Sequence, residues 1–102
     1  MEVRFSEWAK ICLKEIYDHY SGEASSEKAT EIVNKIIDRA ETLENYPNRG
    51  RVEDDLIYIG KGHRYLQEYH YKIIYKVDRE IVIVTDIFSN YQKPTRKPKR
   101  NK

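Results

Sequence analysis

The chain has 102 residues, of which 35% are charged and 39% hydrophobic, and its net charge is +2. This length has room for one domain around one core, and the apolar residues recur in periodic blocks, which favours a folded domain over disorder. No stretch approaches the roughly 18–20 apolar residues that cross a bilayer, and residues 1–5 lead directly into charged residues rather than an apolar signal region, so we expect a cytoplasmic protein without a membrane partner.

Residues 1–5 are predicted to form a short strand, and a helix follows. Ser6 stands at the N-cap position, and Glu7 suits the positive end of the helix dipole. The apolar residues of this helix recur at steps of three and one, typical of one helical face: Ala9, Cys12, Leu13, Ile16, Tyr17 and Tyr20. The pair Ser21-Gly22 is predicted to end it. Cys12, the only cysteine, is interpreted as a small buried residue, and its inability to form an internal disulfide agrees with a reducing compartment.

A second helix is predicted from the N-cap pair Ser25-Ser26 to the helix breaker Pro47. Its apolar stripe is more regular than that of the first helix and consists of Ala29, Ile32, Val33, Ile36, Ile37, Ala40 and Leu43. Asn48 and Gly50 then supply turn residues. Two amphipathic helices with a short polar link predict an antiparallel helical hairpin.

The period changes after the hairpin, and the remaining elements read as strands. They are residues 56–59, 64–69, 71–77 and 81–88, with turns at residues 60–62 and 78–80. The last strand is rich in β-branched residues, as expected of a strand covered on much of both sides. The predicted fold class is therefore α+β: an N-terminal strand, an antiparallel helical hairpin, and a three- to four-stranded, largely antiparallel sheet. We expect a single domain over residues 1–92 and a basic, flexible tail over residues 93–102.

The tail concentrates the positive charge of the chain. Residues 93–102 hold six Lys/Arg and no acid, whereas residues 1–92 hold 13 Lys/Arg and 17 Asp/Glu, a net charge of −4. A tail of this kind suits an RNA, ribosomal or acidic-protein partner, because Lys and Arg release counterions from phosphates. The alternative is a solvated terminus that only aids solubility.

Motifs for nucleotide, metal or nucleophilic chemistry are absent, so no cofactor and no metal are expected. Topology instead gathers charged and polar residues at one face of the predicted sheet. They are Arg49, Arg51, Glu53, Asp54, Asp55, Lys61, His63, Arg64, Lys72, Lys76, Tyr91, Gln92 and Lys93. Metal-free RNA cleavage needs a group that activates the 2′-hydroxyl, cations for the charged phosphorane, and an acid for the leaving oxygen. A solvated face with cross-strand ion pairs is the alternative.

An ordered series of short motifs resembles the RelE/ParE family of toxins over about residues 1–94. The series runs through Arg4-Phe5-Ser6, Tyr46-Pro47, Gly50-Arg51, Arg64-Tyr65-Leu66, Tyr71-Lys72-Ile73-Ile74-Tyr75-Lys76-Val77, Ile81-Val82-Ile83-Val84 and Asp86-Ile87-Phe88-Ser89-Asn90-Tyr91-Gln92-Lys93-Pro94. The resemblance implies the toxin of a type II toxin–antitoxin pair, of the kind associated with plasmid stabilization, neutralised by a cognate antitoxin. RelE-like members cut mRNA on the ribosome, whereas ParE-like members inhibit DNA gyrase.

The resemblance also implies residue roles. Lys72 stands where RelE-like nucleases usually carry an arginine. Tyr91 stands where many relatives carry an arginine and some nucleases carry a catalytic tyrosine. Glu53 stands near the position at which some relatives have an acidic general base. The candidate catalytic residues are Tyr91, Lys72, Arg64, Arg51 and Glu53, and the candidate RNA-binding residues are Lys61, Lys76, Lys93, Arg96 and Lys97. Trp8 and Ile11 fall off the core stripe of the first helix, so with Glu15 they are candidates for antitoxin binding; single exposed apolar residues are the alternative for the first two.

Three functions follow from this resemblance. The first is a ribosome-dependent mRNA interferase, a metal-independent endoribonuclease that requires Tyr91, Lys72 and Arg51 or Arg64 to converge on one phosphate. The second is a ParE-like gyrase inhibitor without nuclease activity, for which the long second helix and the Tyr46-Pro47-Asn48-Arg49-Gly50-Arg51 turn are closer matches. The third is a non-toxic relative that only binds an antitoxin.

Overall fold

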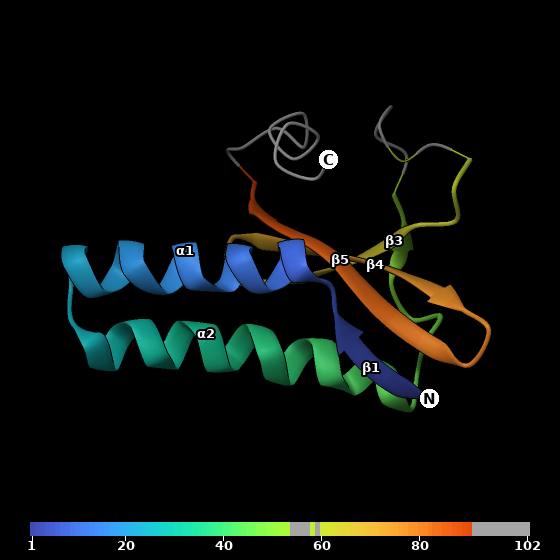
Figure 1. Cartoon of the computed structure of the whole chain (residues 1–102), viewed down its shortest axis with the longest axis horizontal. Helices are drawn as coiled ribbons and strands as arrows, with labels where there is room; N and C mark the ends of the chain where they lie inside the picture. Colours follow the sequence, from blue (N-terminus) through green and yellow to red (C-terminus); the bar gives the residue numbers. More distant parts are fainter. Residues whose placement is uncertain (54–57, 59, 91–102) are drawn as a thin grey trace.

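The computed structural model describes residues 1–53, 58 and 60–90 of the chain. Its elements, in chain order, are β1 (Glu2–Phe5), α1 (Glu7–Glu23), α2 (Ser26–Glu41), the 3-10 helix η1 (Thr42–Glu44), β2 (Arg51–Val52), β3 (Arg64–Glu68), β4 (Tyr71–Asp78) and β5 (Ile81–Ser89). The two helices run side by side as a hairpin, and the strands form a twisted sheet next to them (Figure 1). The predicted α+β class, with its helical hairpin, is confirmed.

The sheet has five strands in the order β1-β5-β4-β3-β2. The first and last strands of the chain lie next to each other and are parallel, with Val3 opposite Val82, while every other neighbouring pair is antiparallel. The predicted hairpin of the last two strands is confirmed. The edge strand β2 was not expected from the sequence. The predicted strand at residues 56–59 lies outside the described residues, apart from Tyr58, which is in a turn.

Both helices begin where the sequence predicted. The Oγ of Ser6 accepts a hydrogen bond from the backbone N of Ala9 at 3.1 Å, and the Oγ of Ser25 accepts one from the backbone N of Lys28 at 3.1 Å. These bonds satisfy two of the amide groups that the first turn of a helix leaves without partners. Helix α1 continues to Glu23, so the predicted stop at Ser21-Gly22 was slightly early.

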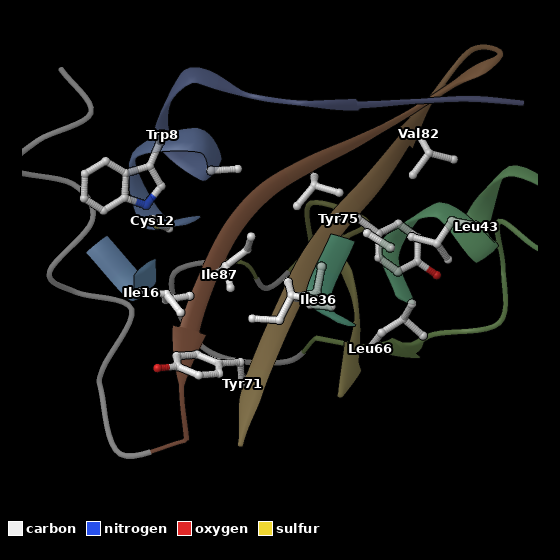
Figure 2. Close-up of a cluster of buried hydrophobic side chains, with 14 of the residues drawn as sticks. Trp8, Cys12, Ile16, Ile36, Leu43, Leu66, Tyr71, Tyr75, Val82 and Ile87 are labelled. Atoms are coloured by element: carbon white, nitrogen blue, oxygen red, sulfur yellow. The ribbon is translucent and has the colours of Figure 1, made fainter. Parts of the chain in front are cut away.

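The core lies between the hairpin and one face of the sheet (Figure 2). Its largest fully buried side chain on that face is Tyr75 of β4, which packs with Ile36 of α2, Leu43 of η1 and Val82 of β5. Because these side chains come from both halves of the chain, the helices and the sheet share one core. No helix in the described part of the chain has the length and apolar character needed to cross a membrane.

Trp8 belongs to this core. The prediction that it lies outside the core is wrong, because its side chain is only 8% exposed. The spacing explains the error: Trp8 lies four residues before Cys12, which lies four before Ile16, so Trp8 extends the predicted stripe by one turn on the same buried side of α1. The interpretation of Cys12 as a buried helix residue is confirmed.

The register of the strands assigns side chains to the two faces of the sheet. On β4, Tyr71, Ile73 and Tyr75 face the helices, so Lys72, Ile74 and Lys76 lie on the other face, here called the open face. The cross-strand partners of these residues add Tyr65, Gln67, Ile83, Asp86 and Phe88 to the open face. Ile74 is nevertheless fully buried. Part of the open face is therefore covered, and the residues next to Ile74 form the candidate site.

Candidate functional site

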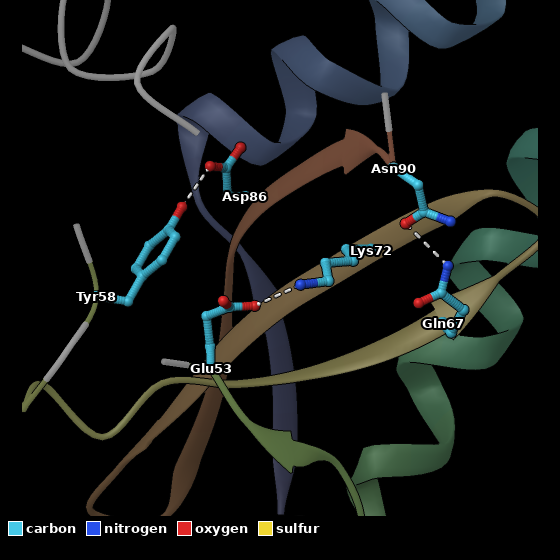
Figure 3. Close-up of polar contacts among 6 residues, drawn as sticks. All are labelled: Glu53, Tyr58, Gln67, Lys72, Asp86 and Asn90. Carbon is cyan, nitrogen blue, oxygen red and sulfur yellow. Dashed lines mark hydrogen bonds and ion pairs between the residues drawn. The ribbon is translucent and has the colours of Figure 1, made fainter. Parts of the chain in front are cut away.

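Two of the predicted catalytic residues meet on the open face. The Nζ of Lys72, projecting from β4, lies 3.1 Å from the Oε1 of Glu53, which follows β2 (Figure 3). The same ammonium lies 4.2 Å from the ring centroid of Tyr65 on β3, an arrangement typical of a cation–π contact. Glu53 is only 4% exposed, and its backbone N donates to the carbonyl of His63 at 2.8 Å. The carboxylate is therefore held rigidly against the cation.

A second buried carboxylate, that of Asp86 on β5, accepts bonds from three side chains. Its Oδ2 accepts from the hydroxyl of Tyr58 at 2.5 Å (Figure 3). Its Oδ1 accepts from the indole Nε1 of Trp8 at 2.7 Å. The Sγ of Cys12 lies 3.6 Å from the same Oδ1. Burial, with a smaller contribution from the charge of Asp86, raises the pKa of the Cys12 thiol to about 12. The thiol thus stays protonated and can donate.

Sequence reasoning assigned no role to Asp86. The available signal was that Asp86 is the single charged residue of a largely apolar strand. A charge in such a position must find partners when the strand is buried. Tyr58 of this cluster also contacts His63, with 4.8 Å between ring centroids. Glu53, which follows β2, is thus bonded to Lys72 of β4, and Tyr58 is bonded to Asp86 of β5.

The two candidate arginines lie on different faces of the sheet. Arg64 is opposite Tyr75 in the β3–β4 register, so it lies on the helix side of the sheet, while Lys72 lies on the open face. Its Nη1 donates to the carbonyl of Gly50 at 2.8 Å and to that of Asn48 at 3.4 Å. Arg51 lies on the edge strand β2, opposite Tyr65 of β3, and is exposed. The structure thus brings Lys72 to Glu53 and does not bring Arg64 to either of them.

The remaining predicted residues are distributed as follows. Lys61 is exposed in the turn before β3, and Lys76 is half-buried on the open face. Tyr91, Lys93, Arg96 and Lys97 lie outside the described residues, as do Asp54 and Asp55. No group of three or more His, Cys, Asp or Glu side chains in the described part of the chain is placed to hold a metal ion.

The candidate antitoxin residues divide into two kinds. Ile11 and Glu15 are exposed on α1, and the Ile11 side chain keeps 44% of its surface accessible. Trp8 instead donates its indole N–H to Asp86 within the protein. The outer surface of α1 therefore offers Ile11 and Glu15, but not Trp8, to a partner.

Comparison with known proteins places this fold in a family. The family model described as the ParE toxin of the type II toxin–antitoxin system parDE matches residues 3–94. A solved structure from the chromosomal ParDE system of P. aeruginosa is similar, with a TM-score of 0.74 and 23% identity over 87% of this chain and 95% of that chain.

The RelBE2 toxin–antitoxin complex from Mycobacterium tuberculosis is also similar, with a TM-score of 0.64 and 17% identity over 89% of this chain and 92% of that chain. Among curated proteins, none matches in sequence. The likeness to the two solved structures concerns the fold, whereas the family model spans nearly the whole sequence. The chain belongs to the ParE toxin family of type II toxin–antitoxin systems.

Proposed function

We propose that this toxin is a metal-independent endoribonuclease that cleaves mRNA on the ribosome and is neutralised by a cognate antitoxin. The observation that carries the proposal is the contact between Glu53 and Lys72. It joins a proton acceptor to a cation, the two kinds of group that metal-free RNA cleavage requires. The pair lies on the face of the sheet that the helical hairpin leaves open.

The chemistry assigns each group one role. The Glu53 carboxylate accepts the proton of a 2′-hydroxyl, and the 2′-oxygen attacks the adjacent phosphorus. As the P–O2′ bond forms and the P–O5′ bond breaks, the Lys72 ammonium stabilises the additional negative charge on the phosphoryl oxygens. The leaving 5′-oxygen takes up a proton from an acid, and the products are a 2′,3′-cyclic phosphate and a 5′-hydroxyl.

Tyr91 is the proposed acid for the leaving oxygen. It lies outside the described residues, but Phe88, three residues before it, is directly opposite Lys72 in the β4–β5 register. The chain therefore passes Lys72 three residues before Tyr91. A phenol hydroxyl can donate a proton to an alkoxide, which is a much stronger base than phenolate.

Three variants test the enzyme. If the toxin is a nuclease, Glu53→Gln, Lys72→Met and Tyr91→Phe should each relieve growth arrest. Each should also remove the new mRNA 5′ ends that primer extension maps, because cleavage falls by about 100-fold or more. Glu80→Gln and Lys35→Met, which alter exposed residues far from the pair, should remain toxic. Full toxicity in Glu53→Gln, with the protein folded, would exclude this function.

A second function, inhibition of DNA gyrase without nuclease activity, is favoured by the match to the ParE family model and by the position of Arg64 on the opposite face from Lys72. In that case the three variants stay toxic, the purified toxin inhibits supercoiling by gyrase, and no mRNA ends appear. A supercoiling assay run beside the primer extension separates the two functions. Continued growth after induction, with no new mRNA ends and no inhibition of supercoiling, would indicate a relative that only binds an antitoxin.

The proposed antitoxin contact is the outer surface of α1. An exposed aliphatic side chain next to a carboxylate, as Ile11 and Glu15 provide, suits an amphipathic partner segment. Replacing Ile11 with Glu should weaken copurification of the toxin with the antitoxin encoded beside it. Replacing Tyr46, which is more exposed but lies after η1, should not. Equal copurification of both variants with the antitoxin would show that the contact lies elsewhere.

A further inference from the structure

Four arginines gather at the β2 edge of the sheet, here called the arginine edge. They are Arg39 of α2, Arg49 of the turn before β2, Arg51 of β2 and Arg64 of β3. The ion pairs in the described part of the chain are made by five lysines and Arg4, and none involves these four arginines. Guanidinium groups recognise carboxylates with two parallel hydrogen bonds. The edge therefore offers cations that the described residues do not neutralise.

Backbone carbonyls hold two of these arginines at the edge. The Nη1 of Arg64 donates to the carbonyl of Gly50 at 2.8 Å, and the Gly50 N–H donates to the buried hydroxyl of Tyr75 at 2.9 Å. The Nε of Arg39 donates to the carbonyl of Gln67 on β3 at 3.3 Å. Side chains that are positioned before binding lose less conformational entropy when a partner binds. The arginine edge is thus built in advance of any contact.

The same edge carries the two most exposed large hydrophobic side chains of the described residues. Val52 of β2 is 64% exposed and Tyr46, before the turn, is 62% exposed. The guanidinium of Arg49 lies over the Tyr46 ring, 5.5 Å from its centroid. Tyrosine and arginine are enriched in protein interfaces, and an aliphatic side chain such as that of Val52 has no counterpart in a phosphate backbone. This composition favours a protein partner over a nucleic acid.

The backbone of β2 is open on the side away from β3. The N–H of Glu53 donates to the carbonyl of His63 at 2.8 Å, so the N–H and carbonyl of the preceding residue, Val52, point away from β3. No described strand pairs with that side of β2. An extended segment can add to such an edge through its main chain. A second copy of this edge would place arginine against arginine, whereas an acidic segment would complement it.

We propose that the arginine edge binds an extended acidic segment of a partner protein, which pairs with β2 as an additional strand. The segment places an apolar side chain against Val52 and carboxylates against Arg49 and Arg51. Two strands separate β2 from β5, against which α1 packs, so this surface is distinct from the proposed antitoxin contact at Ile11. The inference goes beyond the proposed function, because it requires neither RNA cleavage nor inhibition of gyrase.

The test measures the affinity of the purified toxin for a fluorescein-labelled peptide of six glutamates around a central valine, by fluorescence anisotropy at low salt. A peptide with glutamines in place of the glutamates is the matched ligand control and should bind at least about 10-fold more weakly. The double variant Arg49→Gln, Arg51→Gln should weaken binding of the acidic peptide by about 10-fold or more. Arg79→Gln, which changes an exposed arginine of the β4–β5 turn, should stay within about twofold of the wild type.

Val52→Pro tests the strand pairing separately from the charges. It removes the outward N–H of β2 and leaves the pairing of Arg51 and Glu53 with β3, so the melting temperature should change little while peptide affinity falls about 5-fold or more. A folded Val52→Pro variant with wild-type affinity would overturn the inference. So would equal affinity for the two peptides, or no binding of the acidic peptide at up to about 0.3 mM toxin. Tighter binding of a ten-nucleotide oligouridine RNA, lost in the double variant, would overturn it in favour of a nucleic-acid contact.

Discussion

At the scale of single residues, two buried carboxylates join parts of the protein that are distant in sequence. Glu53 and Asp86 are both nearly inaccessible, yet each accepts from side chains far away in sequence, Lys72 for the first and Trp8 and Tyr58 for the second. A buried charge is tolerated only when it is paired and hydrogen-bonded. These contacts therefore fix Glu53 to β4 and Tyr58 to β5.

The ion pair should be measurable as a coupling. Lys72 is 27% exposed at its side chain and Glu53 3%, so removing one partner leaves a largely desolvated charge. Glu53→Gln and Lys72→Met should each lower the free energy of unfolding by about 1–3 kcal/mol, and the double variant should cost clearly less than their sum. Urea denaturation of the four proteins gives the coupling free energy. Strict additivity would mean that the contact contributes nothing to stability.

Lys72 could be predicted from the sequence as a cation on the polar face of a strand, because it alternates with apolar residues. Its partner could not be derived from strand periodicity. Glu53 lies 19 positions earlier, in a segment without a regular repeat; topology placed it only among many residues of one sheet face, and the family resemblance suggested its role. Arg64 looked equivalent to Lys72 in sequence but lies on the other face, since the register of β3 against β4 decides the face and register depends on tertiary pairing.

At the scale of elements, local sequence signals determined where the helices begin. The N-cap serines Ser6 and Ser25 act through one side-chain bond each to the first turn, which depends on neighbours three residues away. The ends were predicted less well, because Gly22 lowers helix propensity by only about 1 kcal/mol and α1 continues through it while packed on α2.

The caps give a test with matched chemistry. Ser6→Ala and Ser25→Ala should each lower the free energy of unfolding by about 1 kcal/mol, because an amide of the first turn loses its acceptor. Ser21→Ala makes the same atomic change inside α1, where the hydroxyl bonds only to the carbonyl of Asp18, so it should stay within about 0.5 kcal/mol of the wild type. Chemical denaturation monitored by circular dichroism compares the three. A cap variant that is as stable as Ser21→Ala would contradict the capping role.

Two glycines give opposite predictions for the same substitution. A Cβ on Gly50 would lie 2.7 Å from the carbonyl oxygen of Tyr65 and 2.7 Å from the hydroxyl of Tyr75, which also accepts from the Gly50 N–H. Gly50→Ala should therefore destabilise by about 1–3 kcal/mol. Gly22 has open space around it within α1, so Gly22→Ala should stabilise by about 0.5–1 kcal/mol. Melting temperatures that shift in the same direction would refute this assignment.

At the scale of the whole molecule, one core joins both ends of the chain. Strand β1 pairs with β5, and Trp8 of α1 reaches Asp86 of β5, so the N-terminal residues complete a sheet made by the C-terminal half. Several ionisable groups lie within this core. Burial raises the pKa values of the Cys12 thiol and of the Tyr71 and Tyr75 hydroxyls above their ordinary values.

These raised pKa values predict a loss of stability in alkali. Below about pH 7 the three groups are protonated in both folded and unfolded chains and contribute no pH dependence. Above it the unfolded chain loses protons first, so the free energy of unfolding falls as the pH rises, for Cys12 up to its folded pKa of about 12. Cys12 alone should account for about 1–2 kcal/mol by pH 10. Cys12→Ala should therefore show a shallower decline between pH 9 and pH 10.5 in urea denaturation. An identical slope would show that the thiol titrates normally.

The sequence by itself determined the class of the fold, the helical hairpin, the caps, the terminal β-hairpin and the family. These features depend on residues within a few positions of one another, or on an ordered series of motifs, and both can be read along the chain. Tertiary structure decided which charges meet. It buried Trp8 against Asp86, paired Glu53 with Lys72 and turned Arg64 to the other face. The physical reason is that strand register and sheet order set these contacts, and both depend on side chains distant in sequence.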